Sequence, residues 1–120
     1  MNVIDMKLTT IAALICFTLV QSVAASTYRC SMKKFIYLED DTITDGQLHD
    51  FFFVVERDFI RFSEGGFFDG AKMPIRLQSK GWLRASDTTD IFDMKDGRFH
   101  YSMVTFLNVR STSGICEKED

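Results

Sequence analysis

Two cysteines constrain the folded part of this chain most strongly, because they lie near both of its ends. Cys30 follows an apolar leader closely, and Cys116 lies close to the C-terminus. In an oxidising compartment, an even number of cysteines in a short domain predicts a disulfide. A disulfide between Cys30 and Cys116 would close a loop that contains most of the folded domain, and closing a loop of that length stabilises a fold by roughly 4–5 kcal/mol. Two free thiols in a redox or metal role are the alternative, but the spacing is not C-x-x-C and no histidine lies near either cysteine.

The leader predicts the compartment. Residues 11–20 (IAALICFTLV) are apolar and uncharged, and Lys7 precedes them. Such a run fits the hydrophobic part of a signal peptide and is too short to span a bilayer of about 30 Å. Small residues at 22–25 supply a cleavage site, although an ordinary buried helix is the alternative. We expect residues 1–25 to be a cleaved signal peptide, and residues 26–120 to be a single domain exported to the periplasm or beyond, without stable membrane insertion.

Short alternating runs separated by turn residues predict an all-β domain. Residues 27–38 alternate with a period of two, which is typical of a strand and places Cys30, Ile36 and Leu38 on one face. Residues 39–46 supply turn chemistry. Asp-Gly at 96–97, between two further alternating runs, predicts a β-hairpin.

The segment 47–58 permits two interpretations. Residues 44–47 could cap a helix, and Leu48 and Phe52 then follow at helical spacing. Residues 51–55 (FFFVV) are aromatic and β-branched, however, which favours a strand and then a second one over 59–62. With this interpretation the chain has seven or eight short strands. We predict a small antiparallel β-barrel or sandwich, closed by the disulfide between its first and last strands.

Charge argues against two classes of partner. The chain has a net charge of −3, and its longest basic run is Lys33-Lys34. Binding of nucleic acid or of an anionic membrane surface needs several clustered cations. We therefore expect no nucleic-acid partner and no recruitment to a charged bilayer.

The sequence contains no motif that predicts catalysis or metal binding. His49 and His100 are the only histidines, and they form no metal-ligand spacing. The acidic residues at 40–45 resemble a calcium loop only faintly, because Ile43 occupies the central ligand position. A nucleophile elbow and a phosphate-binding loop are also missing. We expect no metal, no cofactor and no enzymatic activity; a small hydrolase that uses scattered carboxylates or His100 is the alternative.

Two groups of aromatic residues are candidate binding residues. Phe67 and Phe68 lie in a glycine-rich loop, 63–70, and Trp82 lies close to Arg84 in sequence. Tryptophan and arginine are the residues that most often anchor protein interfaces. The simpler alternative is that these aromatic side chains complete the core of a small domain.

Five short motifs stand out: Tyr28-Arg29-Cys30, Lys33-Lys34, Asp45-Gly46-Gln47-Leu48, Phe53-Val54-Val55-Glu56-Arg57 and Thr112-Ser113-Gly114-Ile115-Cys116. Together they resemble those of a group of short exported proteins of proteobacteria, most of them uncharacterised. That resemblance implies a bacterial, periplasmic protein and no particular activity. In outline the chain is also similar to periplasmic lysozyme inhibitors of the small-barrel type, with residues 79–82 (SKGW) as the nearest match to their inhibitory loop.

These observations favour one function over the others. We expect a non-enzymatic binding module of the bacterial envelope whose partner is an envelope or extracellular protein. A small envelope hydrolase and a protein similar to the lysozyme inhibitors are the alternatives.

Overall fold

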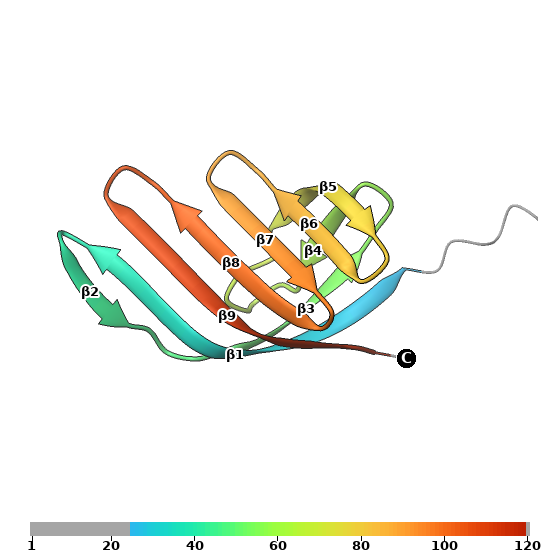
Figure 1. The fold of residues 1–120 in the computed structure, drawn as a ribbon, viewed down its shortest axis with the longest axis horizontal. Coiled ribbons are helices and arrows are strands. Elements are labelled where there is room, and N and C mark those ends of the chain that lie inside the picture. The colour runs from blue at the N-terminus through green and yellow to red at the C-terminus, as the bar shows by residue number, and fades with distance from the viewer. Residues whose placement is uncertain (1–24, 120) are drawn as a thin grey trace, which may run out of the picture.

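The computed structural model describes residues 25–119, in which every regular element is a β-strand (Figure 1). The predicted leader lies outside the described residues, except for Ala25. The all-β prediction is confirmed. The strands are β1 (Ser26–Glu39), β2 (Thr42–Asp45), β3 (Asp50–Val55), β4 (Phe59–Phe62), β5 (Lys72–Ser79), β6 (Trp82–Ser86), β7 (Asp90–Lys95), β8 (Arg98–Val104) and β9 (Asn108–Lys118).

The strands form a closed antiparallel barrel. The order is β2-β1-β3-β4-β5-β6-β7-β8-β9, and an additional pairing between β1 and β9 joins the ends of the sheet. The barrel has eight strands, and β2 adds one more beside the C-terminal half of β1. Closure removes the long free edges that a sheet rich in phenylalanine would otherwise expose.

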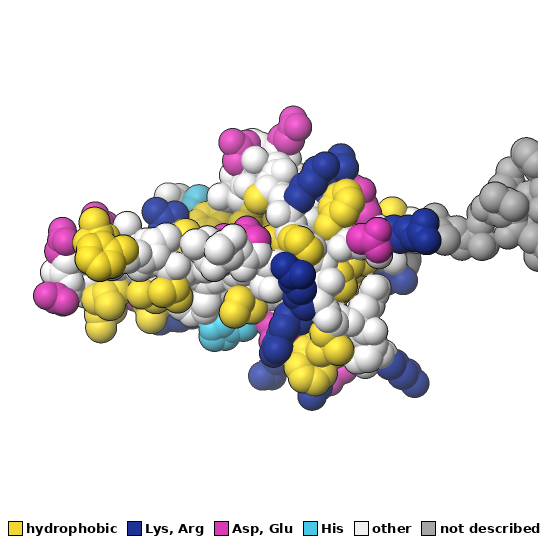
Figure 2. Space-filling view, turned by 90° about the horizontal axis from the view of Figure 1, so that it is seen from above, with side chains coloured by type: hydrophobic (Ala, Val, Ile, Leu, Met, Phe, Trp, Pro, Cys, Tyr) yellow, Lys and Arg dark blue, Asp and Glu magenta, His cyan; other side chains and the backbone are white. Residues whose placement is uncertain are grey.

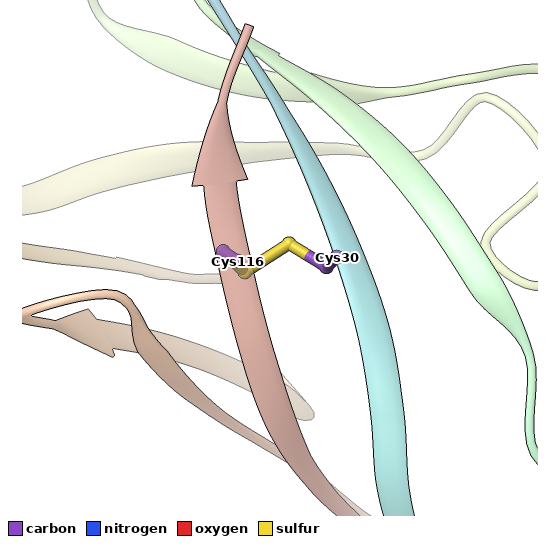
Figure 3. The surroundings of a disulfide bond; sticks show 2 residues. All are labelled: Cys30 and Cys116. Carbon is purple, nitrogen blue, oxygen red and sulfur yellow. A yellow bond between two sulfur atoms is a disulfide. The ribbon is translucent and has the colours of Figure 1, made fainter.

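The predicted disulfide joins the two strands that close the barrel. Cys30 on β1 and Cys116 on β9 are direct cross-strand partners whose Cα atoms lie 4.0 Å apart (Figure 3). Both cysteines are buried. The bond therefore links the first strand of the barrel to the last, as the sequence predicts.

A β-bulge in β1 changes which residues of this strand face the barrel interior, so one part of the strand prediction is wrong. The register with β9 shifts between Met32 and Lys34, so two successive residues, Lys33 and Lys34, are exposed. The inward face consequently changes from even-numbered to odd-numbered positions. The prediction that Ile36 and Leu38 share a face with Cys30 is wrong: both lie on the outer face, because an extra residue reverses the alternation of a strand.

Tight turns join the strands at two places where the sequence predicts turn chemistry. Asp96 and Gly97 both have positive φ, 51° and 79°, which fits the two-residue turn of the β7–β8 hairpin. Asp40 and Asp41 have φ of 48° and 64° and form a second such turn. The short strand β2, which follows this second turn, is an element that the sequence did not reveal.

Phenylalanine side chains fill the barrel. Phe53, Phe62 and Phe92 are fully buried, and their ring centroids lie 5.0–5.8 Å apart. Phe53 belongs to β3 and Phe62 to β4, so the strand interpretation of residues 51–55 and 59–62 is confirmed. Burial of such rings is the largest favourable contribution that a domain of this size can make to its own stability.

Two hairpins continue beyond the barrel. The β1–β2 hairpin and the β8–β9 hairpin project together to the left in Figure 1 and form a four-stranded sheet, β2-β1-β9-β8. We call this part, residues 36–45 and 102–111, the extension. Within the described part of the chain, no helix is long and apolar enough to cross a membrane.

Candidate functional site

The pairing register of strands β6 to β9 places charged side chains in two rows on the outer wall of the barrel. Cross-strand partners on one face of a sheet lie close enough for their side chains to interact. The first row crosses β6 to β9 as Trp82, Lys95, Arg98 and Ile115, and the second as Arg84, Asp93, His100 and Ser113.

Asp93 fixes the two residues that the sequence selected on β6. The Trp82 indole Nε1 donates a hydrogen bond of 2.6 Å to Asp93 Oδ1. Arg84 Nη2 and Nε both donate to the other carboxylate oxygen, Asp93 Oδ2, at 2.8 and 3.2 Å, and form an ion pair with it. Such charge-assisted bonds hold long side chains in one orientation. The structure therefore brings Trp82 and Arg84 together in a single ordered unit.

Cations flank the tryptophan ring. Lys95 Nζ lies 5.0 Å from the ring centroid of Trp82, and Arg84 Cζ lies 5.5 Å from it. Both distances are within the range of cation–π attraction. Among residues 25–119, Lys33, Lys95 and Arg98 form no ion pair, so their charges are available to a ligand.

These side chains surround an open hollow of about 840 Å³ on the outer wall. Asp96 contributes a carboxylate at its edge, and Phe99 and Gly114 also line it. The cations outnumber the unpaired carboxylate, so the hollow favours an anionic ligand. We call this site the Trp82 hollow and define it by Lys33, Trp82, Lys95, Asp96, Arg98 and His100.

The β-bulge and a glycine shape the hollow. Lys33 reaches it because the bulge in β1 leaves this residue unpaired opposite β9. A Cβ atom on Gly114 would overlap the carbonyl oxygen of Ser31 and approach the Phe99 ring to 2.7 Å. A side chain at position 114 would therefore push β9 away from β1, and only glycine permits this close approach.

Phe67 and Phe68 lie elsewhere, in the loop between β4 and β5. Phe68 stacks on Phe62 with ring centroids 4.0 Å apart and contacts Tyr101 edge-on at 4.8 Å. Phe67 contacts the Phe35 ring at 5.3 Å. Both are partly buried and pack against the core, so they do not form one site with Trp82.

Phe67 also lines a second, smaller hollow. This space of about 350 Å³ lies on the inner side of the extension, where Tyr37, His49 and Arg110 are the other main side chains. A binding role for Phe67 and Phe68 thus stays a prediction, while their packing already accounts for their apolar character.

Potential catalytic groups are few in this region. His100 Nε2 lies 3.1 Å from Ser111 Oγ on the outer wall. Asp93 is the cross-strand neighbour of His100, but both of its carboxylate oxygens already accept hydrogen bonds from Trp82 and Arg84. Among the described residues, no group of three or more His, Cys, Asp or Glu side chains could hold a metal ion.

One buried acid–base contact lies inside the barrel. The hydroxyl of Tyr101 donates a hydrogen bond to Asp90 Oδ2. Burial raises the pKa of Tyr101 well above its ordinary value, and the hydrogen bond to the Asp90 carboxylate raises that pKa further. The contact fixes the end of β7 against β8.

Of the residues that define the Trp82 hollow, only Trp82 was a candidate binding residue from the sequence, although one turn motif could have indicated two more. The Asp96-Gly97 turn fixes the register of its hairpin, so Lys95 and Arg98 are necessarily cross-strand partners on the outer face. Lys33 could not be found this way, because it joins the site only through the bulge and the closure of the barrel.

The chain matches no protein-family model, no curated protein and no solved structure in the three comparisons. The fold and the site together define a disulfide-closed antiparallel β-barrel with a cationic, tryptophan-containing hollow on its outer wall.

Proposed function

We propose that this protein is an exported, non-enzymatic binding module of the bacterial envelope, and that it holds an acidic surface of a partner protein in the Trp82 hollow. One observation carries the proposal: an ordered tryptophan lies among three cations that have no ion pair within the described residues. The leader and the Cys30–Cys116 disulfide support export.

The geometry of the hollow suits a protein interface. Trp82 is held by Asp93, so little conformational entropy is lost when a partner packs against its ring. Tryptophan and arginine dominate the energetics of most interfaces. Lys33, Lys95 and Arg98 would speed association with an acidic surface and make binding sensitive to salt.

Affinity capture tests the proposal. The oxidised, exported protein is immobilised and exposed to native envelope extract, and retained proteins are identified by mass spectrometry. The test variant is Lys95→Glu with Arg98→Glu, which reverses two charges of the hollow. The control is Arg57→Glu with Lys72→Glu, which makes the same change of net charge at the β3–β4 turn and on β5.

We expect the wild type and the control to retain the same acidic protein, and the test variant to lose it. Retention of that protein by the test variant at the level of the control would contradict the proposal. A muramidase retained by all three proteins would instead favour the inhibitor-like alternative.

The contact between His100 and Ser111 is the one observation that favours a hydrolase. A serine activated by histidine would react with a fluorophosphonate probe, and Ser111→Ala would abolish the labelling. Labelling of Ser111 would support this second candidate. Unlabelled protein that still binds its partner would support the binding module.

A further inference from the structure

The outer face of the extension carries a continuous apolar row. Ile43 lies opposite Leu38, Leu38 lies opposite Val109, and Val109 lies opposite Val104. One apolar side chain from each of the strands β2, β1, β9 and β8 therefore lies side by side. Ile43 is 72% exposed and Val104 is 58% exposed.

Two further apolar side chains lie at the tip of the extension. Phe106, in the turn between β8 and β9, is 98% exposed, and Leu107 is 64% exposed. Figure 2 shows hydrophobic side chains gathered at this end of the molecule next to acidic ones. A contiguous exposed apolar patch of this kind marks an interaction site on a folded protein.

The row ends at a free strand edge. Among the described residues β2 pairs with β1 alone, so its other edge has backbone N–H and C=O groups available for pairing. A further strand added there would extend the sheet and place its own apolar side chains beside Ile43.

The charges of the extension indicate which kind of segment would pair with the free edge of β2. The extension carries four carboxylates, whereas Arg110 is its only cation: the acidic residues are Glu39, Asp40, Asp41 and Asp45. Asp45 is paired with the exposed Lys34 at 3.4 Å, and the other three form no ion pair within residues 25–119.

Self-pairing of this edge gains no opposite charges from the carboxylates of β2. If a second copy added its own β2 in antiparallel orientation with Ile43 opposite Ile43, Asp41 of one copy would lie opposite Asp45 of the other, which Lys34 partly compensates. Like charges in opposing positions destabilise a strand pair. A partner strand with lysine or arginine at one end would instead meet the carboxylates of Asp40 and Asp41 at the start of β2, which form no ion pair within residues 25–119.

We propose that the extension is a docking site for an extended cationic segment of a partner protein, which adds as a strand to β2 and packs apolar side chains on the row Ile43, Leu38, Val109 and Val104. This surface is separate from the Trp82 hollow and opposite to it in charge. A module with both surfaces binds two proteins at once, one acidic and one basic.

The test uses a short fluorescent peptide of alternating lysine and valine and the oxidised, exported protein. Fluorescence anisotropy measures binding at low and high salt. A peptide with glutamate in place of lysine tests charge, and one with a central proline tests pairing of the backbone. Ile43→Thr removes apolar surface from β2, and Ile91→Thr is the matched control on β7, which lies four strands away in the sheet.

Asp41→Asn removes one carboxylate and keeps a residue that tolerates positive φ. Its control is Asp58→Asn in the β3–β4 turn. Circular dichroism and an intact disulfide confirm that each variant folds.

We expect saturable binding of the lysine–valine peptide, weakened at least about tenfold by Ile43→Thr and severalfold by Asp41→Asn or high salt. The controls and Trp82→Ala are expected to bind as the wild type does, which separates this surface from the Trp82 hollow. Equal binding of the glutamate or proline peptide, or equal effects of Ile43→Thr and Ile91→Thr, would overturn the proposal. A dimer that Ile43→Thr dissociates, or lipid vesicles that bind through Phe106, would overturn it as well.

Discussion

Reduction of the Cys30–Cys116 disulfide is the perturbation whose effect the structure fixes most closely. The bond spans 86 positions of sequence and joins the strands whose pairing closes the barrel. The loop-closure relation for a loop of this length gives about 4.6 kcal/mol at 25 °C. Because β1 and β9 are paired over most of their lengths, we expect the reduced native state to keep the same strand order.

The assay compares oxidised and reduced protein in guanidinium unfolding, followed by circular dichroism and by the fluorescence of Trp82. We expect the reduced form to lose about 4–5 kcal/mol of unfolding free energy. That is a large share of the roughly 5–15 kcal/mol of a typical domain. Cys30→Ala with Cys116→Ala serves as the control, because the reducing agent has no target in it. A difference below about 1 kcal/mol would refute the reasoning.

Three further predictions follow from single contacts. Gly114→Ala should destabilise the barrel by about 1–3 kcal/mol or more, because the new methyl group overlaps the Ser31 carbonyl oxygen. Thermal unfolding measures the loss of stability. An unchanged midpoint would show that β9 can move away from β1 without cost. Phe62→Ala should cost about 3–5 kcal/mol in guanidinium unfolding, because Phe62 is fully buried among aromatic rings, and a loss near zero would contradict that packing. Tyr101→Phe should cost about 1 kcal/mol through the lost bond to Asp90. Since the folded-state pKa of Tyr101 lies above its unfolded value near 10, the wild type should become less stable as the pH rises beyond about 10, and the variant should lack that part of the decline.

Local rules predicted the parts of the fold that depend on neighbouring residues. The Asp96-Gly97 turn and the alternation around it gave the β7–β8 hairpin, because this dipeptide accepts the positive φ that a tight hairpin needs. The aromatic and β-branched run at 51–55 gave β3 instead of a helix. Two cysteines, near the start of the described residues and near their end, predicted the bond that closes the barrel.

The remaining features depend on contacts between distant strands. Nothing local marks Lys33 as the extra residue of a bulge, yet this residue reverses the faces of Ile36 and Leu38 and exposes them. A continuous strand without a bulge would have placed these two positions on the same face as Cys30, which is what the alternation of the sequence predicted. The Trp82 hollow also needs closure, since its cations come from β1, β7 and β8.

Trp82 offers the most direct test of the binding surface, because it is the only tryptophan in the chain. Its fluorescence is recorded during titration with the protein that affinity capture retains, for the wild type and for Lys95→Glu with Arg98→Glu. We predict a saturable change in Trp82 emission for the wild type that salt weakens and the charge-reversed variant loses. Binding of the partner without any change in Trp82 emission, or an identical titration of the variant, would contradict the assignment of the hollow as the binding surface.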